Sequence, residues 1–227
     1  MKNKKNIPTP IDGTLRKSAL RVPEVIRECS GIYVFGRRIK SLVFTTDIAI
    51  IRNVNADAVL AVYPFTPQPV ITQSLLSASD IPVFAGVGGG LTGGKRVSVL
   101  AVNAEMQGAF GVVLNAPTLN EVAKDVVDLV DIPVIMTVVN DDTDIDARIE
   151  AGVSIINVSA AKETPRIVKM IKEKYPDFPV IATGGPTDES ILETIKAGAN
   201  AITWTPPGTA ELFKEVMSAY RLGLPHP

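Results

Sequence analysis

Three ionisable side chains, Asp47, Lys95 and Lys162, come directly after short apolar segments or in the loops that follow them. A carboxylate and a lysine can exchange protons with a substrate, and a lysine can also polarise a carbonyl group. His226 is the single histidine and Cys29 the single cysteine, which excludes a histidine triad, a multi-histidine metal site and an intramolecular disulfide. We therefore expect any catalysis to depend on Asp47 together with Lys95 or Lys162.

Each of these residues also has a purely structural interpretation. Asp47 precedes an expected helix at 48–54 and is a suitable N-cap for it. Lys162 comes shortly before Thr164, the expected cap of another helix, so it either pairs with a substrate phosphate or carbonyl or is simply solvated. Lys95 ends a glycine-rich segment at 86–95, which is either a mobile loop that closes over a site or an exposed loop.

The glycine-rich segment matches two nucleotide-binding patterns, but only superficially. Arg96 stands where a phosphate-binding loop has the serine or threonine that binds magnesium, and the next strand ends in Asn115 instead of an acidic residue. Both patterns are therefore rejected, and the sequence predicts no cofactor. The acidic run Asp141, Asp142 and Asp144 has oxygen ligands that suit magnesium, but such runs are more often loops and helix caps, so no metal is predicted.

Composition limits the possible partners and compartments. Hydrophobic residues make up 46% of the 227 positions and charged residues 21%, so the chain can bury a large core without disulfides. The net charge is −1 and no basic patch follows the first residues, which argues against nucleic-acid binding. The polar, proline-rich start does not resemble a signal peptide, and we expect a cytoplasmic protein that binds no membrane. A mean hydropathy of +0.23 and the N-terminal extension favour a homo-oligomer.

Internal repeats predict the fold. Segments such as Ile-Pro-Val-Phe alternate with segments such as Gly-Ala-Asn-Ala-Ile, each apolar without strict alternation, as in parallel strands covered on both faces. The expected strands are 41–46, 58–64, 81–87, 109–115, 132–138, 153–159, 178–184 and 201–205. Eight strands alternating with helices predict a single (β/α)₈ TIM barrel of the α/β class at 41–227.

Residues 1–40 precede this barrel as an extension. We expect helical character at 15–28 and a β-hairpin around Gly36 and Arg37, together forming a lid over the amino-terminal face of the barrel. A dimerisation arm is the alternative.

Barrel enzymes place their sites after the carboxyl ends of the strands. Aligning the repeats there yields a ring of mostly neutral polar side chains, which suits a small, polyhydroxylated substrate. The predicted ring consists of Thr46, Tyr63, Asn115, Thr137, Ser159, Thr183 and Thr205. For any single member, pairing with the strand-end backbone is the alternative.

The last two strand ends resemble a known superfamily. Thr183-Gly184-Gly185, followed by a helix that ends in Lys-Ala-Gly-Ala, is similar to the phosphate-binding (β/α)₈ barrels, which include keto-deoxy-phosphogluconate aldolases, thiamine phosphate synthase and N-acylmannosamine-6-phosphate epimerases. This resemblance implies that Gly184, Gly185, Gly208 and Thr209 bind a substrate phosphate. Over its whole length the chain also resembles small bacterial barrel proteins that carry a general hydrolase label, which implies no mechanism.

We therefore expect an enzyme that binds a phosphorylated or polyhydroxylated, anionic small molecule, with lyase or epimerase (isomerase) acid–base chemistry. A hydrolase of a similar metabolite and a non-catalytic ligand-sensing barrel are the two alternatives. The predicted catalytic residues are Asp47, Lys95 and Lys162.

Overall fold

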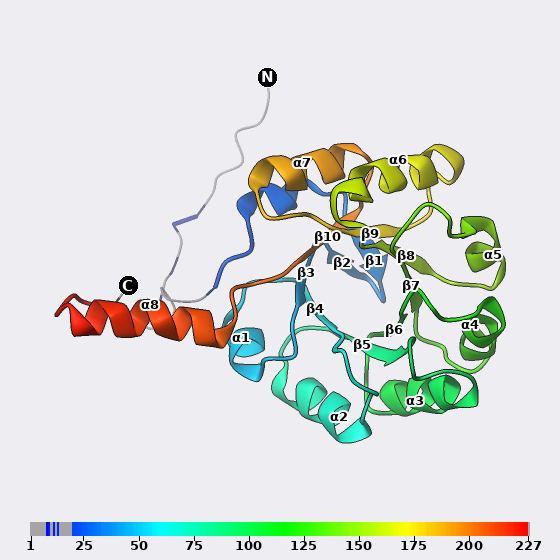
Figure 1. Ribbon diagram of the computed structural model, residues 1–227, viewed down its shortest axis with the longest axis horizontal. Coiled ribbons are helices and arrows are strands. Elements are labelled where there is room, and N and C mark those ends of the chain that lie inside the picture. Colours follow the sequence, from blue (N-terminus) through cyan, green and yellow to red (C-terminus); the bar gives the residue numbers. More distant parts are fainter. Residues whose placement is uncertain (1–7, 10, 12, 14–19, 227) are drawn as a thin grey trace.

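The computed structural model describes residues 8, 9, 11, 13 and 20–226. Eight parallel strands close into a barrel in the order β10-β3-β4-β5-β6-β7-β8-β9, which confirms the predicted (β/α)₈ fold (Figure 1). The barrel strands are β3 (Ser41–Phe44), β4 (Ala58–Ala61), β5 (Val83–Gly88), β6 (Gly111–Leu114), β7 (Val134–Val138), β8 (Ile155–Val158), β9 (Val180–Thr183) and β10 (Ala201–Trp204). The α-helices are α1 (Ile48–Asn53), α2 (Pro69–Ala78), α3 (Lys95–Met106), α4 (Asn120–Val127), α5 (Ile145–Glu150), α6 (Thr164–Lys174), α7 (Asp188–Lys196) and α8 (Thr209–Arg221).

A proline comes directly before three of the strands and still takes part in the sheet. Proline has no N–H group, but the carbonyl groups of Pro82, Pro133 and Pro179 each accept a hydrogen bond from a strand on the neighbouring side, at 2.8–3.1 Å. The regular strands therefore begin two residues later than the repeats predicted, at Val83, Val134 and Val180.

Side chains alternate between two apolar clusters along each strand. Val59, Val112 and Ile156 face outward and pack beneath the helices. Leu60, Val113 and Ile155 belong to the second cluster, which fills the barrel interior. This alternation determines which residues near the strand ends face the barrel axis.

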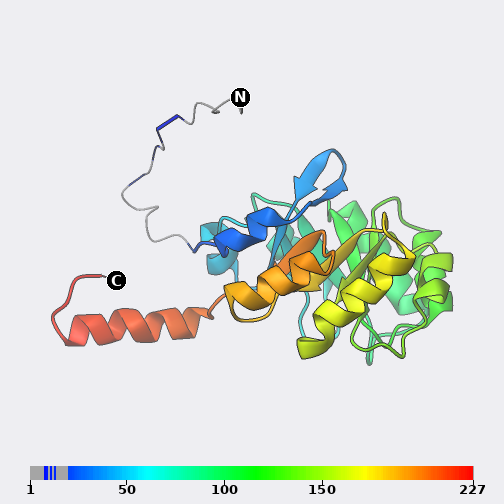
Figure 2. The same cartoon turned by 90° about the horizontal axis from the view of Figure 1, so that it is seen from above.

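A β-hairpin, β1 (Ile32–Val34) and β2 (Arg37–Ile39), lies at one end of the barrel (Figure 2). Its turn is centred on Phe35 and Gly36, one residue before the predicted position, and both have positive φ, 45° and 76°. Ile32, Val34 and Ile39 are buried against the barrel-interior cluster. The hairpin therefore covers the amino-terminal end of the barrel, opposite the expected site.

The segment before the hairpin covers the outside of the barrel. Val22, Ile26 and Cys29 are buried in the same cluster as Val43 of β3 and Ile202 of β10. The predicted helix at 15–28 is replaced here by a short 3₁₀-helix, η2 (Glu24–Glu28), beside α7 (Figure 1), because Pro23 disfavours helical backbone at the residue before it. Residues 15–19 of that predicted helix lie outside the described residues.

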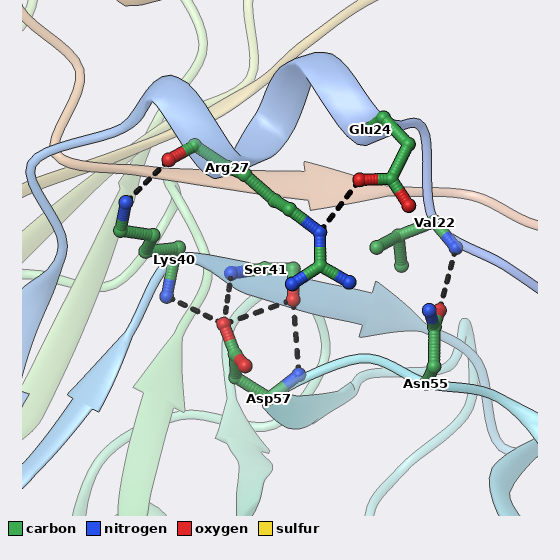
Figure 3. A network of polar contacts seen from close by, with 7 residues as sticks. All are labelled: Val22, Glu24, Arg27, Lys40, Ser41, Asn55 and Asp57. Carbon is green, nitrogen blue, oxygen red and sulfur yellow. Dashed lines mark hydrogen bonds and ion pairs between the residues drawn. The ribbon is translucent and has the colours of Figure 1, made fainter. Parts of the chain in front are cut away.

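Polar contacts join this segment to the barrel (Figure 3). The backbone N–H of Val22 donates to Asn55 at 2.8 Å, and Lys40 donates through its ammonium group to the carbonyl oxygen of Arg27. Asp57 accepts from the backbone and hydroxyl groups of Ser41, both at 3.0 Å, and from the Lys40 N–H at 2.8 Å. Asp57, the residue before β4, thus joins the start of β4 to the start of β3 by hydrogen bonds.

The last helix does not pack on the barrel. α8 projects away from it in both views (Figures 1 and 2) and has no buried residue, unlike the other α-helices in the described part of the chain. Across the described residues, no helix combines the length and the apolar character that a membrane span requires.

Candidate functional site

Five polar side chains gather at the carboxyl ends of β7 to β10. Asn157 and Ser159 follow the interior residue Ile155 at alternate positions, so both face the barrel axis. The amide of Asn157 donates to the Thr137 hydroxyl at 3.3 Å, and the Thr183 hydroxyl donates to Ser159 at 3.3 Å. Thr203 is paired in register with Thr183 on the neighbouring strand. We call Thr137, Asn157, Ser159, Thr183 and Thr203 the polar crown.

Two atoms of the polar crown are buried without a partner. Asn157 and Thr203 are each 5% exposed, and Asn157 Oδ1 and Thr203 Oγ1 make no hydrogen bond within the described part of the protein. Burying an unpaired polar atom destabilises a fold by about 1–3 kcal/mol. Both atoms are inaccessible to solvent in this structure, so a ligand at this end of the barrel reaches them only when neighbouring side chains move.

The opposite wall of the mouth is mainly apolar. Phe44 ends β3, is 38% exposed and follows the interior residue Leu42 by two positions, while Val62 packs against the interior cluster. Beside this wall lies a pocket of about 520 Å³ that contains the predicted residues Tyr63 and Asn115. The Tyr63 hydroxyl accepts a hydrogen bond from the backbone of Gln68 at 2.9 Å, so it stabilises its own loop.

A second pocket, of about 350 Å³, lies next to the polar crown. It is lined by Lys162 from the 3₁₀ turn η3 (Ala161–Glu163), by Thr183 at the end of β9, by Gly184 and Gly185 after it, and by Glu193 of α7. The structure therefore brings Lys162 to Gly184 and Gly185, the glycines after β9 that the family resemblance implies as phosphate-binding residues. It also places a carboxylate, Glu193, in the same pocket.

Asp47 is engaged in structural contacts. One carboxylate oxygen accepts from the backbone N–H groups of Ala49, at 2.8 Å, and Ile50, at 3.3 Å, and so caps α1. The other oxygen accepts a short hydrogen bond from the Thr209 hydroxyl. The pKa of Asp47 lies below its usual value, first because of the Thr209 hydrogen bond; burial opposes this effect, and the backbone donors of Ile50 and Ala49 add to it.

Two backbone N–H groups at the positions that the family resemblance implies for phosphate binding already donate to other groups of the protein. The Gly208 N–H donates to the Glu211 carboxylate at 2.8 Å, and the Gly184 N–H donates to the Thr203 carbonyl at 3.4 Å. Glu211 and Asp47 place two negative charges beside the start of α8, and this disfavours an anion there. The Lys162 pocket offers an anion a more favourable environment.

The remaining predicted residues lie elsewhere. Lys95 is exposed at the start of α3 and does not line either pocket, and Thr205 is exposed after β10. Thr46 is half-buried beside Asp47. Asp141 pairs with Arg166 at 2.7 Å, and Asp144 caps α5. Within the described ranges, three or more histidine, cysteine or acidic side chains do not gather as a metal ion requires.

Four further residues at this end of the barrel are not among the aligned strand ends: Asn157, Thr203, Glu193 and Phe44. Asn157 and Thr203 are polar residues inside the otherwise apolar stretches Ile-Ile-Asn-Val and Ala-Ile-Thr-Trp, and this interruption was the available signal. Glu193 had no such signal, because an acidic residue in a helix is usually solvated.

Comparisons with known proteins support the fold. No protein-family model matches the chain. Inosine-5'-monophosphate dehydrogenase of Chlorobaculum parvum is 41% identical over 64 residues, which cover 26% of this chain and 13% of that enzyme. The matched region is thus a small part of the curated relative.

Solved structures match over much more of the chain. A putative phosphonomutase from Burkholderia cenocepacia has a TM-score of 0.64 at 16% identity, over 81% of this chain and 93% of that one. Phosphonopyruvate hydrolase has a TM-score of 0.61 at 14% identity, over 82% and 84% of the two chains. Thiamine phosphate pyrophosphorylase from Pyrococcus furiosus has a TM-score of 0.53 at 17% identity, over 73% and 84%. At these identities the similarity concerns architecture: the protein is a (β/α)₈ barrel of the kind found in these structures.

Proposed function

We propose that the protein is an enzyme that binds a small polyhydroxylated metabolite at the carboxyl ends of β7 to β10. The observation that carries this proposal is the pair of buried, unpartnered atoms, Asn157 Oδ1 and Thr203 Oγ1. An amide oxygen accepts from a substrate hydroxyl, and a threonine hydroxyl either donates or accepts. Two such groups on β8 and β10, with apolar Phe44 on β3, the neighbour of β10, suit a molecule that has both hydroxyl groups and an apolar face.

The charged end of the substrate belongs beside Lys162. Lys162 lines one pocket together with Gly184, Gly185 and Thr183 of the polar crown, so a phosphate or carboxylate there is adjacent to the hydroxyl-binding groups. Some of the similar proteins have names that refer to phosphorus-containing compounds, namely inosine monophosphate, phosphonopyruvate and thiamine phosphate. Others, a dihydrodipicolinate synthase from Bacillus anthracis and a mandelate oxidase, do not, so the names do not decide between a phosphate and a carboxylate, and the pocket is compatible with either anion.

Acid–base chemistry of the lyase or epimerase type is the reaction class that we favour. Lys162 and Glu193 share the pocket, and a lysine and a carboxylate together can move a proton at a carbon next to a carbonyl group. Asp47 is a poorer general base than its position in the sequence suggested, because hydrogen bonds hold both of its oxygens. A non-catalytic ligand sensor is the second candidate, since all five residues of the polar crown are uncharged.

A ligand screen with matched variants tests the proposal. The native protein is mixed with a panel of sugar phosphates, phosphorylated keto acids and their unphosphorylated forms, and binding is measured by calorimetry and turnover by product analysis. Asn157→Leu keeps the side-chain volume and removes the hydrogen-bonding groups, so we expect affinity to fall by about tenfold or more. Asn103→Leu, on α3 and hydrogen-bonded to Gln107, is the matched control and should bind normally.

The variant Lys162→Met distinguishes binding of the substrate anion beside Lys162 from binding of hydroxyl groups at the polar crown. We expect this variant to lose its preference for the phosphorylated member of each pair, while its affinity for the unphosphorylated member stays unchanged. Binding without product formation would favour the sensor. The proposal is wrong if the panel yields no ligand or if Asn157→Leu binds its ligand as the native protein does.

A further inference from the structure

α8 carries an apolar stripe that its own chain covers only in part. Leu212, Phe213, Val216, Met217 and Tyr220 recur at helical spacing, and Phe213 and Tyr220 remain 61% and 50% exposed. A helix of 13 residues is marginally stable in water unless one face is packed. We therefore expect the apolar stripe of α8 to pack against another protein surface.

The chain's own barrel cannot supply this surface in the usual way. In a (β/α)₈ barrel the last helix packs outside the last and first strands, here β10 and β3. In this protein that place is filled by the segment that contains Val22, Ile26 and Cys29, which are all at most 5% exposed. Folding α8 back onto the barrel would expel these three side chains.

We propose that α8 packs against α8 and α1 of a second copy of this chain, across a two-fold axis. Each chain has a groove of about 540 Å³ between these helices, lined by Ala49 and Ile50 on the α1 side and by Leu212 and Val216 on the α8 side. The α8 of the second copy enters this groove with its apolar stripe, and the α8 of the first copy enters the equivalent groove. Both stripes and both grooves are thereby covered in one closed interface.

Charge favours an antiparallel arrangement of the two helices. The first turn of α8 contains Glu211 and its last turn contains Arg221. In an antiparallel pair the acidic start of each helix lies beside the basic end of the other. The whole chain carries a net charge of only −1, so two copies approach without strong mutual repulsion.

Sedimentation of the full chain at several concentrations tests this interface. We expect a native species of twice 24.2 kDa. Val216→Glu places a carboxylate in the interface and should raise the dimer dissociation constant by about 100-fold or more. Val99→Glu is the matched control, because Val99 is an exposed valine on α3, on another side of the barrel, and this variant should remain dimeric (Figure 1). Far-UV circular dichroism checks that both variants are folded.

Cross-linking tests the position of the contact independently of variant stability. Met217→Cys near the middle of α8 should form a covalent dimer with a short bis-maleimide, and Val99→Cys should not. The native Cys29 is buried and does not interfere. A native chain that is monomeric at all concentrations overturns the proposal, as does a Val216→Glu variant that is as dimeric as Val99→Glu or a Met217→Cys variant that does not cross-link.

Discussion

The hydroxyl of Thr209 donates a hydrogen bond to the carboxylate of Asp47, a residue 162 positions earlier in the chain. The bond joins the loop after β3 to the start of α8, after β10, where the first and last strands of the barrel meet. It holds Asp47 as an anion and fixes the base of the projecting helix. The same carboxylate caps α1, so one side chain organises both helices beside this junction.

Replacing Thr209 by valine should raise the pKa of Asp47. The folded-state pKa is now below the usual value, chiefly because of Thr209, so the contribution of Asp47 to stability is present above the unfolded pKa and lost as the pH falls through the folded one. The stability difference between native protein and variant should therefore be largest at neutral pH and shrink below about pH 4. Carboxyl-carbon NMR titration measures the pKa.

Thr143→Val is the control for this experiment, because the Thr143 hydroxyl pairs with Asn140 and with no carboxylate. An unchanged pKa of Asp47 in Thr209→Val would contradict the assigned hydrogen bond.

Two buried threonines should respond in opposite ways to replacement by valine. Thr203 Oγ1 has no partner in the described structure, so Thr203→Val removes an unsatisfied hydroxyl and should raise the free energy of unfolding by about 1 kcal/mol. The Thr194 hydroxyl donates to the Ser190 carbonyl at 3.0 Å, so Thr194→Val should lower this free energy by about the same amount. Denaturant titration of both variants makes the comparison, and equal destabilisation would show that Thr203 has a partner.

Cys29 should be unreactive in the folded protein. Burial raises the pKa of its thiol to about 12, with the Lys40 charge acting in the opposite direction, so the reactive thiolate is scarce at about pH 8. A chromogenic disulfide reagent should label the native protein at the rate of local or global opening and label the denatured protein at once. Rapid labelling under native conditions would mean that the segment at 20–29 detaches readily from the barrel.

The positive φ of Gly36 in the hairpin turn leads to a further prediction, about backbone strain. A Cβ atom at either Gly36 or Gly93 would meet nothing within 4 Å, but Gly36 has a φ of +76° and Gly93 is outside the positive-φ region. Gly36→Ala should lower the free energy of unfolding by about 1 kcal/mol through strain alone, and Gly93→Ala should leave it nearly unchanged. Thermal unfolding of the two variants provides the measurement, and similar losses in both would contradict the turn geometry.

Much of the fold could be predicted from the repeats, because parallel strands covered on both faces are apolar runs and the loops between them are short. The strand starts were misplaced by two residues at the Ile-Pro-Val segments, because a proline that lacks an N–H group contributes only its carbonyl to the sheet. The position of α8 could not be predicted: its amphipathic pattern resembles that of helices that do pack on the barrel, such as α6.

The sequence predicts the residues of the candidate site that lie at aligned strand ends. It does not predict the residues that are brought together only by the packing of distant segments. Counting from the repeats located Thr137, Ser159 and Thr183 correctly at one end of the barrel. It missed Asn157, which lies one position before the end of β8, because only the observed hydrogen bond shows that its amide faces Thr137. Similarly, the proximity of Lys162 and Glu193 depends on how α6 and α7 pack.

The contact between residues 20–31 and the final strand also has a consequence for protein synthesis. Gly31 donates to the Asn200 carbonyl at 2.7 Å, and Asn200 donates to Ser30 at 2.8 Å across 170 positions. Until β10 has left the ribosome, β3 lacks its neighbour on that side and the segment at 20–29 lacks the part of its docking surface that contains Ile202. The nascent chain therefore carries an open sheet edge at β3 until β10 emerges, and the barrel can close only then.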